Sequence, residues 1–197
     1  DVLFCEVSFE EIIKGSRFLS ELIPCTSQTQ AREIIKFQKA KYADSTHVVH
    51  AFIVGHNAEI MGMSDDGEPS GTAGRPVLDV LKGRKCTNCI LTVTRWLGGT
   101  LLGTGGLVKA YSSGAKNVIL QADSKKAFCE LVEKATFSFT TDYNLYKLIK
   151  NHLEQFDIYN LKEDFAEEIT LSGEIRASQF SKMSEILLNI SNGKIKL

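Results

Sequence analysis

The sequence predicts an α+β protein made of two domains, and three observations support this prediction. Segments with the alternation and β-branched residues of strands are interleaved with segments of helical periodicity. Eleven of the 15 glycines lie between residues 62 and 114, and only two follow that stretch. A short polar segment with the sequence QADSKK, residues 121–126, separates the part of the chain that contains most of the glycines from the part that contains only two. We therefore expect domains at residues 1–124 and 125–197.

Two hairpins with a helix between them are predicted for the first part of the chain. Lys14-Gly15 and the segment 55–57 are turn signals, and Thr26 or Ser27 can cap a helix. The expected elements are strands at 2–9 and 16–25, a helix at 29–41, and strands at 47–54 and 58–63.

A pair of glycine-rich loops, each leading into a helix, is predicted next. Residues 64–74 are too rich in Gly, Pro, Asp and Ser for regular structure, and Pro76 suits a first helical turn that Gly83 would end. The clearest strand is 89–96, with the sequence CILTVTRW. We expect a second glycine loop at 97–106 and a helix at 107–120.

The sequence of the C-terminal part predicts six elements in the order strand, helix, strand, strand, helix, strand. This is the order of a split βαβ, or ferredoxin-like, domain. The expected bounds are 128–139, 142–155, 158–165, 168–176, 178–191 and 194–197.

Composition and charge exclude several classes of protein. No apolar run approaches the ~18–20 residues of a membrane span, and no secretory signal begins the chain, so we expect a cytoplasmic protein without a membrane partner. The formal net charge is −1, with +2 through residue 126 and −3 beyond it. Nucleic-acid binding would therefore need a local basic patch. The five scattered cysteines are expected to be reduced thiols.

Five spaced motifs carry a resemblance to a known family. They are SRF at 16–18, DSTH at 44–47, SDDGEPSGTAGRP at 64–76, TRWLGG at 94–99 and LGTGGLVKAYSSG at 102–114. Together they resemble the IMPACT family, in its bacterial YigZ branch, over residues 16–120. The Trp96-Leu97 pair departs from the Tyr-Phe pair that is common there, and the segment 48–50 is less polar than usual.

The resemblance implies a fold for each domain and a role in translation. It implies an N-terminal domain like the second domain of ribosomal protein S5, and a C-terminal domain similar to the last domain of elongation factor G. Both of those relatives touch ribosomal RNA. The eukaryotic members of the family are translation regulators that bind a partner of a stress kinase, whereas the bacterial members have no settled biochemical activity.

The first glycine loop carries three carboxylates, Asp65, Asp66 and Glu68. They could hold a hard cation through oxygen ligands. The alternative is that they cap backbone N–H groups, with Glu68 pairing with Arg75 or Arg95.

The end of this loop is a candidate anion site. Ser70, Thr72 and the backbone N–H groups up to Gly74 and Arg75 lie where a helix is expected to begin, and helix N-termini attract phosphate.

The second loop is a candidate phosphate cradle. Its glycines are Gly98, Gly99, Gly103, Gly105 and Gly106, and Arg95 and Lys109 are the expected charge partners. The spacing of a P-loop or of a Rossmann fingerprint is absent. Close packing of helix on strand explains the glycines equally well. Trp96 could stack on a base or could be a core residue.

Two other patterns are weaker. Cys86 and Cys89 form a lone CxxC, which lacks a second pair of zinc ligands and is followed by a strand rather than a helix, so buried thiols are the default expectation. Ser70, His47 and Asp66 could form a hydrolytic triad, but the GxSxG signature is missing.

The sequence favours a non-enzymatic RNA- or ribosome-binding protein, in the manner of a translation regulator. Arg75, Arg95 and Lys109 would contact phosphates in a groove lined by both glycine loops. The alternatives are a metal- or phosphate-dependent hydrolase of small molecules and a protein-interaction module. No cofactor and no catalytic residue are predicted.

Overall fold

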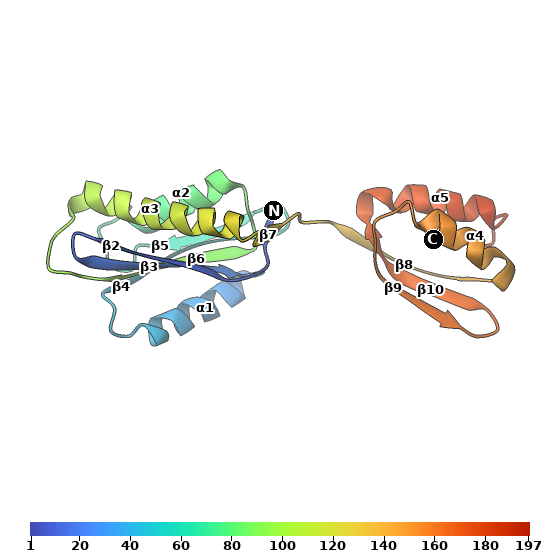
Figure 1. Cartoon of the computed structure of the whole chain (residues 1–197), viewed down its shortest axis with the longest axis horizontal. Coiled ribbons are helices and arrows are strands. Elements are labelled where there is room, and N and C mark those ends of the chain that lie inside the picture. Colours follow the sequence, from blue (N-terminus) through green and yellow to red (C-terminus); the bar gives the residue numbers. More distant parts are fainter. The chain divides into compact units, whose positions relative to one another are not determined.

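The computed structural model describes residues 1–197 and divides them into two compact units, Asp1–Leu131 and Val132–Leu197 (Figure 1). Each unit combines an antiparallel sheet with helices, which confirms the α+β class. The junction expected after residue 124 coincides with the end of a long helix. Beyond it, β7 (Phe128–Cys129) pairs with β1 (Val2–Leu3), and this pairing keeps the residues up to Leu131 with the first unit.

The first unit is built on a five-stranded antiparallel sheet with the order β2-β3-β6-β4-β5. The central strand β6 has the predicted bounds, and seven of its eight residues are buried because helices cover both faces of the sheet. The first hairpin closes through Lys14 and Gly15, whose φ angles of 47° and 82° suit a two-residue turn. The strands are β2 (Val7–Ile13), β3 (Ser16–Pro24), β4 (His47–Val54), β5 (Ile60–Ser64) and β6 (Cys89–Trp96).

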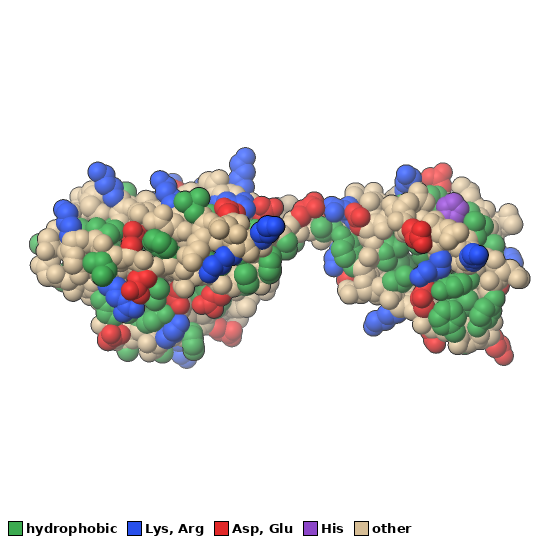
Figure 2. All heavy atoms as spheres, in the orientation of Figure 1, with side chains coloured by type: hydrophobic (Ala, Val, Ile, Leu, Met, Phe, Trp, Pro, Cys, Tyr) green, Lys and Arg blue, Asp and Glu red, His purple; other side chains and the backbone are tan.

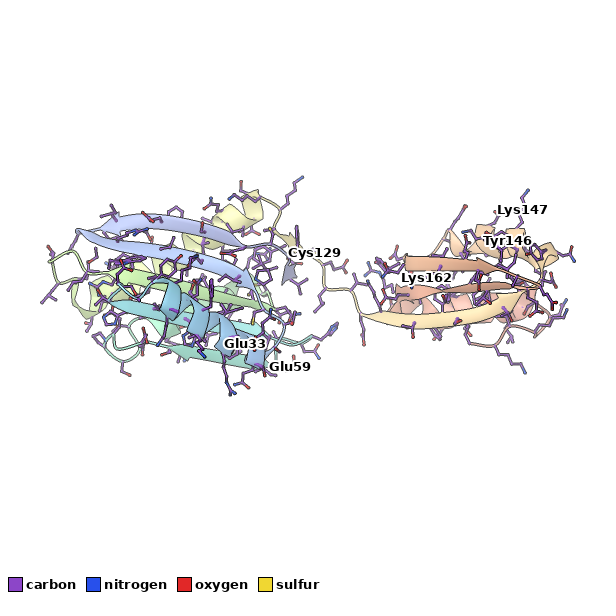
Figure 3. All side chains as sticks on the ribbon, turned by 90° about the horizontal axis from the view of Figure 1, so that it is seen from below. Glu33, Glu59, Cys129, Tyr146, Lys147 and Lys162 are labelled. Atoms are coloured by element: carbon purple, nitrogen blue, oxygen red, sulfur yellow. The ribbon has the colours of Figure 1, made fainter.

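Three helices cover the two faces of this sheet. Helices α2 (Gly74–Arg84) and α3 (Gly103–Ser124) lie on one face, and α1 (Gln28–Lys41) lies on the other (Figures 1 and 3). The alternation of strand side chains separates the two cores: Ala51 and Ile53 of β4 pack in the core under α2 and α3, whereas Phe52 and Val54 pack in the core under α1.

The expected bounds of both helices after the glycine loops are wrong. α3 begins at Gly103 rather than at residue 107, so Gly103, Gly105 and Gly106 belong to its first turn and not to a loop. Each glycine costs about 1 kcal/mol of helix propensity, but the apolar residues that α3 buries along the sheet offset this. α2 continues through Gly83 to Arg84 and ends with Lys85 in the left-handed region.

Three expected strands are also divided or absent. The strand expected at 2–9 is split into β1 and β2, and the strand expected at 128–139 is split into β7 and β8. The last strand, at 194–197, does not form; this segment is irregular and buries Ile195 in the core of the second unit.

The second unit has a three-stranded antiparallel sheet with the order β8-β10-β9. This is the split βαβ arrangement without its last strand. Asp142 caps α4 by accepting a hydrogen bond from the backbone N–H of Leu145 (2.9 Å). The elements are β8 (Lys134–Thr141), α4 (Tyr143–Leu153), β9 (Ile158–Phe165), β10 (Ile169–Arg176), a 3-10 turn (Ala177–Gln179) and α5 (Phe180–Ile190). No helix in either unit combines the length and apolar character that a membrane crossing requires.

Candidate functional site

The start of α2 is capped by the chain's own carboxylate. Asp65 accepts hydrogen bonds from the backbone N–H groups of Gly71 (2.8 Å), Ala73 (3.1 Å) and Gly74 (2.8 Å). Burial opposes ionisation of Asp65, but the three hydrogen bonds together outweigh it and lower the pKa of the carboxyl group. Of the amides expected to bind an external anion, those of Ala73 and Gly74 are therefore occupied by Asp65, and that of Thr72 donates to the carbonyl of Pro69 (3.1 Å).

Asp66 joins the same loop to two other elements. Its carboxylate accepts a hydrogen bond from the backbone N–H of Val48 (2.7 Å) and pairs with Lys39 of α1. Its backbone carbonyl lies 2.7 Å from Nδ1 of His47, which donates to it. Asp66 itself has a φ of 45°, so these contacts hold the turn in a conformation that few residues adopt.

Glu68 is the buried member of the three. Its Oε1 accepts hydrogen bonds from Nη1 of Arg95 (2.6 Å) and from the hydroxyl of Tyr111 (2.8 Å), and its Oε2 lies 3.7 Å from Nε2 of His47. The side chains of Glu68 and Arg95 are only 4% and 5% exposed. Burial, and then the charge of Glu68, raise the pKa of Tyr111, so its hydroxyl stays a hydrogen-bond donor.

These contacts assemble neither a cation site from the three carboxylates nor a triad of Ser70, His47 and Asp66, the two alternatives that the sequence left open. The three carboxylates are turned toward different partners, and no group of three or more His, Cys, Asp and Glu side chains is placed to hold a metal ion. Ser70 is exposed and its hydroxyl makes no hydrogen bond to His47, whose two ring nitrogens face Asp66 and Glu68. Thr72 is buried and donates its hydroxyl to the carbonyl of Pro69 (2.6 Å).

The second loop runs over residues 97–102, and its glycines have different roles. Gly98 packs on the backbone of Gly15, where an added Cβ would lie 1.7 Å from the carbonyl oxygen, so close packing accounts for this glycine. Gly99 has open space around it and a φ of 84°. Trp96, just before the loop, donates its Nε1–H to Asp44 (3.0 Å) and lies under the guanidinium of Arg17, 4.3 Å from the ring centre.

The two loops nevertheless meet around one cavity of about 330 Å³. The first loop contributes Glu68 and Pro69, and the second contributes its leucines together with the start of α3. The N-terminus of α3 has no capping side chain, because its N-cap residue is Leu102. The backbone N–H groups of the first turn are left free for a ligand or for water. The lining residues are Thr46, His47, Glu68, Pro69, Arg95, Leu97, Leu101, Leu102, Gly103, Thr104 and Leu107.

Eight of the 15 basic residues up to residue 126 lie elsewhere, on α2, α3 and the residues that end them. We call this surface the basic helix layer; it has eight basic and two acidic side chains, a formal net charge of +6, whereas the whole chain has −1. Figure 2 shows Lys and Arg side chains along this edge of the first unit. The residues are Arg75, Lys82, Arg84, Lys85, Lys109, Lys116, Lys125 and Lys126, with Asp79 and Asp123.

A groove of about 830 Å³ runs between α2 and α3 within this layer. Arg75 and Arg84 border it from α2, and Lys116 borders it from α3. Arg75 pairs with Asp79 at 2.9 Å, but Lys109 and Lys116 are exposed and form no ion pair. Lys116 was not among the predicted site residues. Its position seven residues after Lys109 could have indicated it, because that spacing puts both side chains on one side of the helix.

Comparisons with known proteins give a matching family model for each of the two units. The fold and the site define this chain as a two-domain α+β protein. Residues 14–119 match the Impact N-terminal domain, and residues 139–194 match a domain of unknown function (DUF1949). The chain is 32% identical to the IMPACT family member YigZ of Escherichia coli, covering 97% of this chain and 93% of that protein. It is 30% identical to the IMPACT family member YvyE of Bacillus subtilis, covering 94% and 83%.

The chain therefore belongs to the IMPACT family, as its motifs indicated. A solved structure described as that of a hypothetical protein has the same fold. It is 29% identical, aligns over 98% of this chain and 93% of its own, and has a TM-score of 0.67.

Proposed function

We propose that this protein is a non-enzymatic RNA-binding protein that acts in translation, and that it contacts RNA phosphates through the basic helix layer and the free start of α3. The observation that carries the proposal is the concentration of a net charge of +6 on two neighbouring helices and the residues that end them, in a chain whose total charge is −1. A patch of this kind attracts polyanions regardless of the net charge of the protein.

The contacts follow the length of α3. Its first-turn amides can donate to a phosphate at one end, and Lys109 and Lys116 lie further along the same helix, about 10 Å apart at 1.5 Å per residue. Arg75 adds a guanidinium on the far side of the groove. Its exposed pair with Asp79 is worth only about 0.3–0.5 kcal/mol, so a phosphate can replace that partner.

Arg95 is not part of the proposed surface, in contrast to its predicted role. Its side chain is 5% exposed and pairs with Glu68, so it can support the cavity wall but cannot reach a phosphate of a folded RNA. Trp96 is likewise engaged by Asp44 and Arg17 and is not included.

Ribosomal RNA is the target we favour. The family resemblance implies that both domains have folds found in proteins that touch ribosomal RNA. It also implies that the eukaryotic relatives regulate translation. The proposed surface reads phosphate positions and not base edges, which suits a structured RNA recognised by its shape.

The test compares two double variants with the same loss of charge. Lys109→Ala with Lys116→Ala removes both free lysines of α3, and Lys36→Ala with Lys147→Ala removes two exposed, unpaired lysines from α1 and α4. Binding to a labelled ribosomal RNA helix is measured by fluorescence anisotropy over a range of salt concentrations. We expect the α3 variant to bind at least about tenfold more weakly at low salt, with a salt slope reduced by about 1.5.

Two results would count against the proposal: no binding by the wild-type protein at low salt, or equal effects of the two double variants. The protein-interaction alternative makes a separate prediction. A protein captured from lysate by the wild-type chain should then remain bound after nuclease treatment, and its capture should not depend on Lys109 and Lys116.

A further inference from the structure

Cys86 lies in the turn between α2 and β6, Cys89 is the first residue of β6, and their sulfur atoms are 3.7 Å apart. Both side chains are buried, with exposed fractions of 2% and 0%. All five cysteines are free thiols, and none of the other three is hydrogen-bonded to another cysteine. This is the one place in the chain where two thiols are already in contact.

The two thiols have different environments. A hydrogen bond from Cys89 lowers the pKa of Cys86, and the nearby Arg84 acts in the same direction against the effect of burial. The pKa of Cys89 is raised, first by its hydrogen bond to Cys86 and then by burial. Cys86 is therefore the sulfur that ionises first, and Cys89 remains a protonated neighbour.

Access to the pair is also one-sided. Cys86 lines a cavity of about 450 Å³, whereas Cys89 does not. Lys82, Lys85 and His56 line the same cavity, together with the acidic Asp1 and Glu130. A small molecule that enters this cavity meets Cys86 and not Cys89.

A strand and not a helix follows the CxxC, so no helix N-terminus is present to activate Cys86. The structure supplies other means of activating the first cysteine, namely the hydrogen bond from the neighbouring thiol and the charge of Arg84. A zinc site is not an alternative, because no third ligand lies within reach of the pair.

We propose that Cys86 and Cys89 are a reversible dithiol–disulfide pair that is oxidised by small hydroperoxides. The thiolate of Cys86 attacks the hydroperoxide oxygen and breaks the O–O bond, which leaves a sulfenic acid on Cys86 and displaces hydroxide or an alkoxide. The displaced group takes up the proton that the Cys86 thiol released on ionising and leaves as water or an alcohol. The sulfur of Cys89 then attacks the sulfur of Cys86, the S–S bond forms, and the displaced hydroxide leaves as water with the proton of Cys89. Two thiols are oxidised and one peroxide is reduced. An external dithiol restores both thiols by exchange.

The pair needs only a small movement for this step. A disulfide requires its sulfur atoms at about 2.05 Å, so the present contact must shorten by roughly 1.6 Å. Thr87 and Asn88, the two residues between the cysteines, form the turn that would adjust.

The test uses the folded wild-type chain with hydrogen peroxide as the probe, followed by thiol alkylation and peptide mass mapping. We expect two of the five thiols to disappear, the peptide containing residues 86–89 to become lighter by about 2 Da, and dithiothreitol to restore it. Cys129, an exposed thiol on β7 that stands alone at the end of the first unit (Figure 3), is the internal control. Cys86 should be lost at least about tenfold faster than Cys129.

Single variants distinguish Cys86, which attacks the peroxide, from Cys89, which attacks the resulting sulfenic acid. Cys89→Ser should stop the reaction at a sulfenic acid on Cys86, which dimedone labels, and Cys86→Ser should leave Cys89 unreacted. Cys129→Ser should change nothing at the pair. The proposal is overturned if peroxide modifies Cys129 while residues 86–89 keep their mass, or if the pair forms no intramolecular disulfide in the wild-type protein, a result that does not depend on whether any variant folds.

Discussion

Glu68 and Arg95 form an ion pair inside the first unit, with 2.6 Å between Oε1 and Nη1 and with neither side chain more than 5% exposed. Glu68 comes from the first glycine loop and Arg95 from the central strand β6, so the pair fixes the loop to the sheet. Tyr111 of α3 donates to the same oxygen, and three elements thus meet at one carboxylate.

Replacing one partner of this pair should be costly. Arg95→Met leaves the Glu68 carboxylate buried without its cation, and we expect a loss of about 3–5 kcal/mol in the free energy of unfolding. Arg75→Met, the matched exposed arginine, should cost less than about 0.5 kcal/mol. Urea unfolding followed by the fluorescence of Trp96, the only tryptophan, reports on the first unit. Similar losses for the two variants would contradict this account.

Removing the hydroxyl of Tyr111 should have a smaller effect of the same kind. Tyr111→Phe keeps the ring packed on Phe18, whose centroid is 5.4 Å away, and deletes only the hydrogen bond to Glu68. We expect about 1–3 kcal/mol of destabilisation in the same unfolding measurement. Because the two contacts share one oxygen, the loss from Tyr111→Phe and Arg95→Met together should differ from the sum of the single losses.

Two glycines of the motif region should respond to alanine in opposite ways. Gly98→Ala puts a methyl group against the backbone of Gly15, which cannot move aside without opening the first hairpin. We expect a loss of more than about 2 kcal/mol. Gly83 lies near the end of α2 with open space around it, so Gly83→Ala should stabilise the unit by about 0.4–1 kcal/mol. The thermal midpoints of the two variants should lie on opposite sides of the wild-type value.

The cap at Asp65 should make part of the stability depend on pH. Folding lowers the pKa of this carboxyl group, so the unfolded chain binds the proton more readily. Its stabilisation is complete above the ordinary value of 3.8 and is lost as the pH falls through the lower value of the folded state. Asp65→Ala should cost about 0.5–2 kcal/mol at pH 7, and this difference from wild type should shrink in acid.

The control for this titration is Glu33→Ala, which removes an exposed carboxylate of α1 that has no partner (Figure 3). Its difference from wild type should stay small at every pH at which the protein folds. If the cost of Asp65→Ala is the same at pH 7 and in acid, the carboxylate does not act as a cap.

The sequence by itself determined the class, the family and most of the elements. β6 could be placed to the residue because its run of apolar and β-branched side chains has no competing interpretation, and Asp142 identified the start of α4 because a short polar side chain before an apolar helical stripe acts locally. Such signals depend on neighbours a few residues away, and these are present in any single sequence.

Only the tertiary structure decided where the charged side chains go. Asp65, Asp66 and Glu68 look equivalent in sequence, yet one caps a helix, one binds α1 and β4, and one is buried against Arg95. The start of α3 was missed for a related reason: packing along the sheet outweighs the poor helix propensity of its glycines. The partner of a charge and the end of a helix are chosen by contacts between distant segments, and these contacts exist only after the chain has folded.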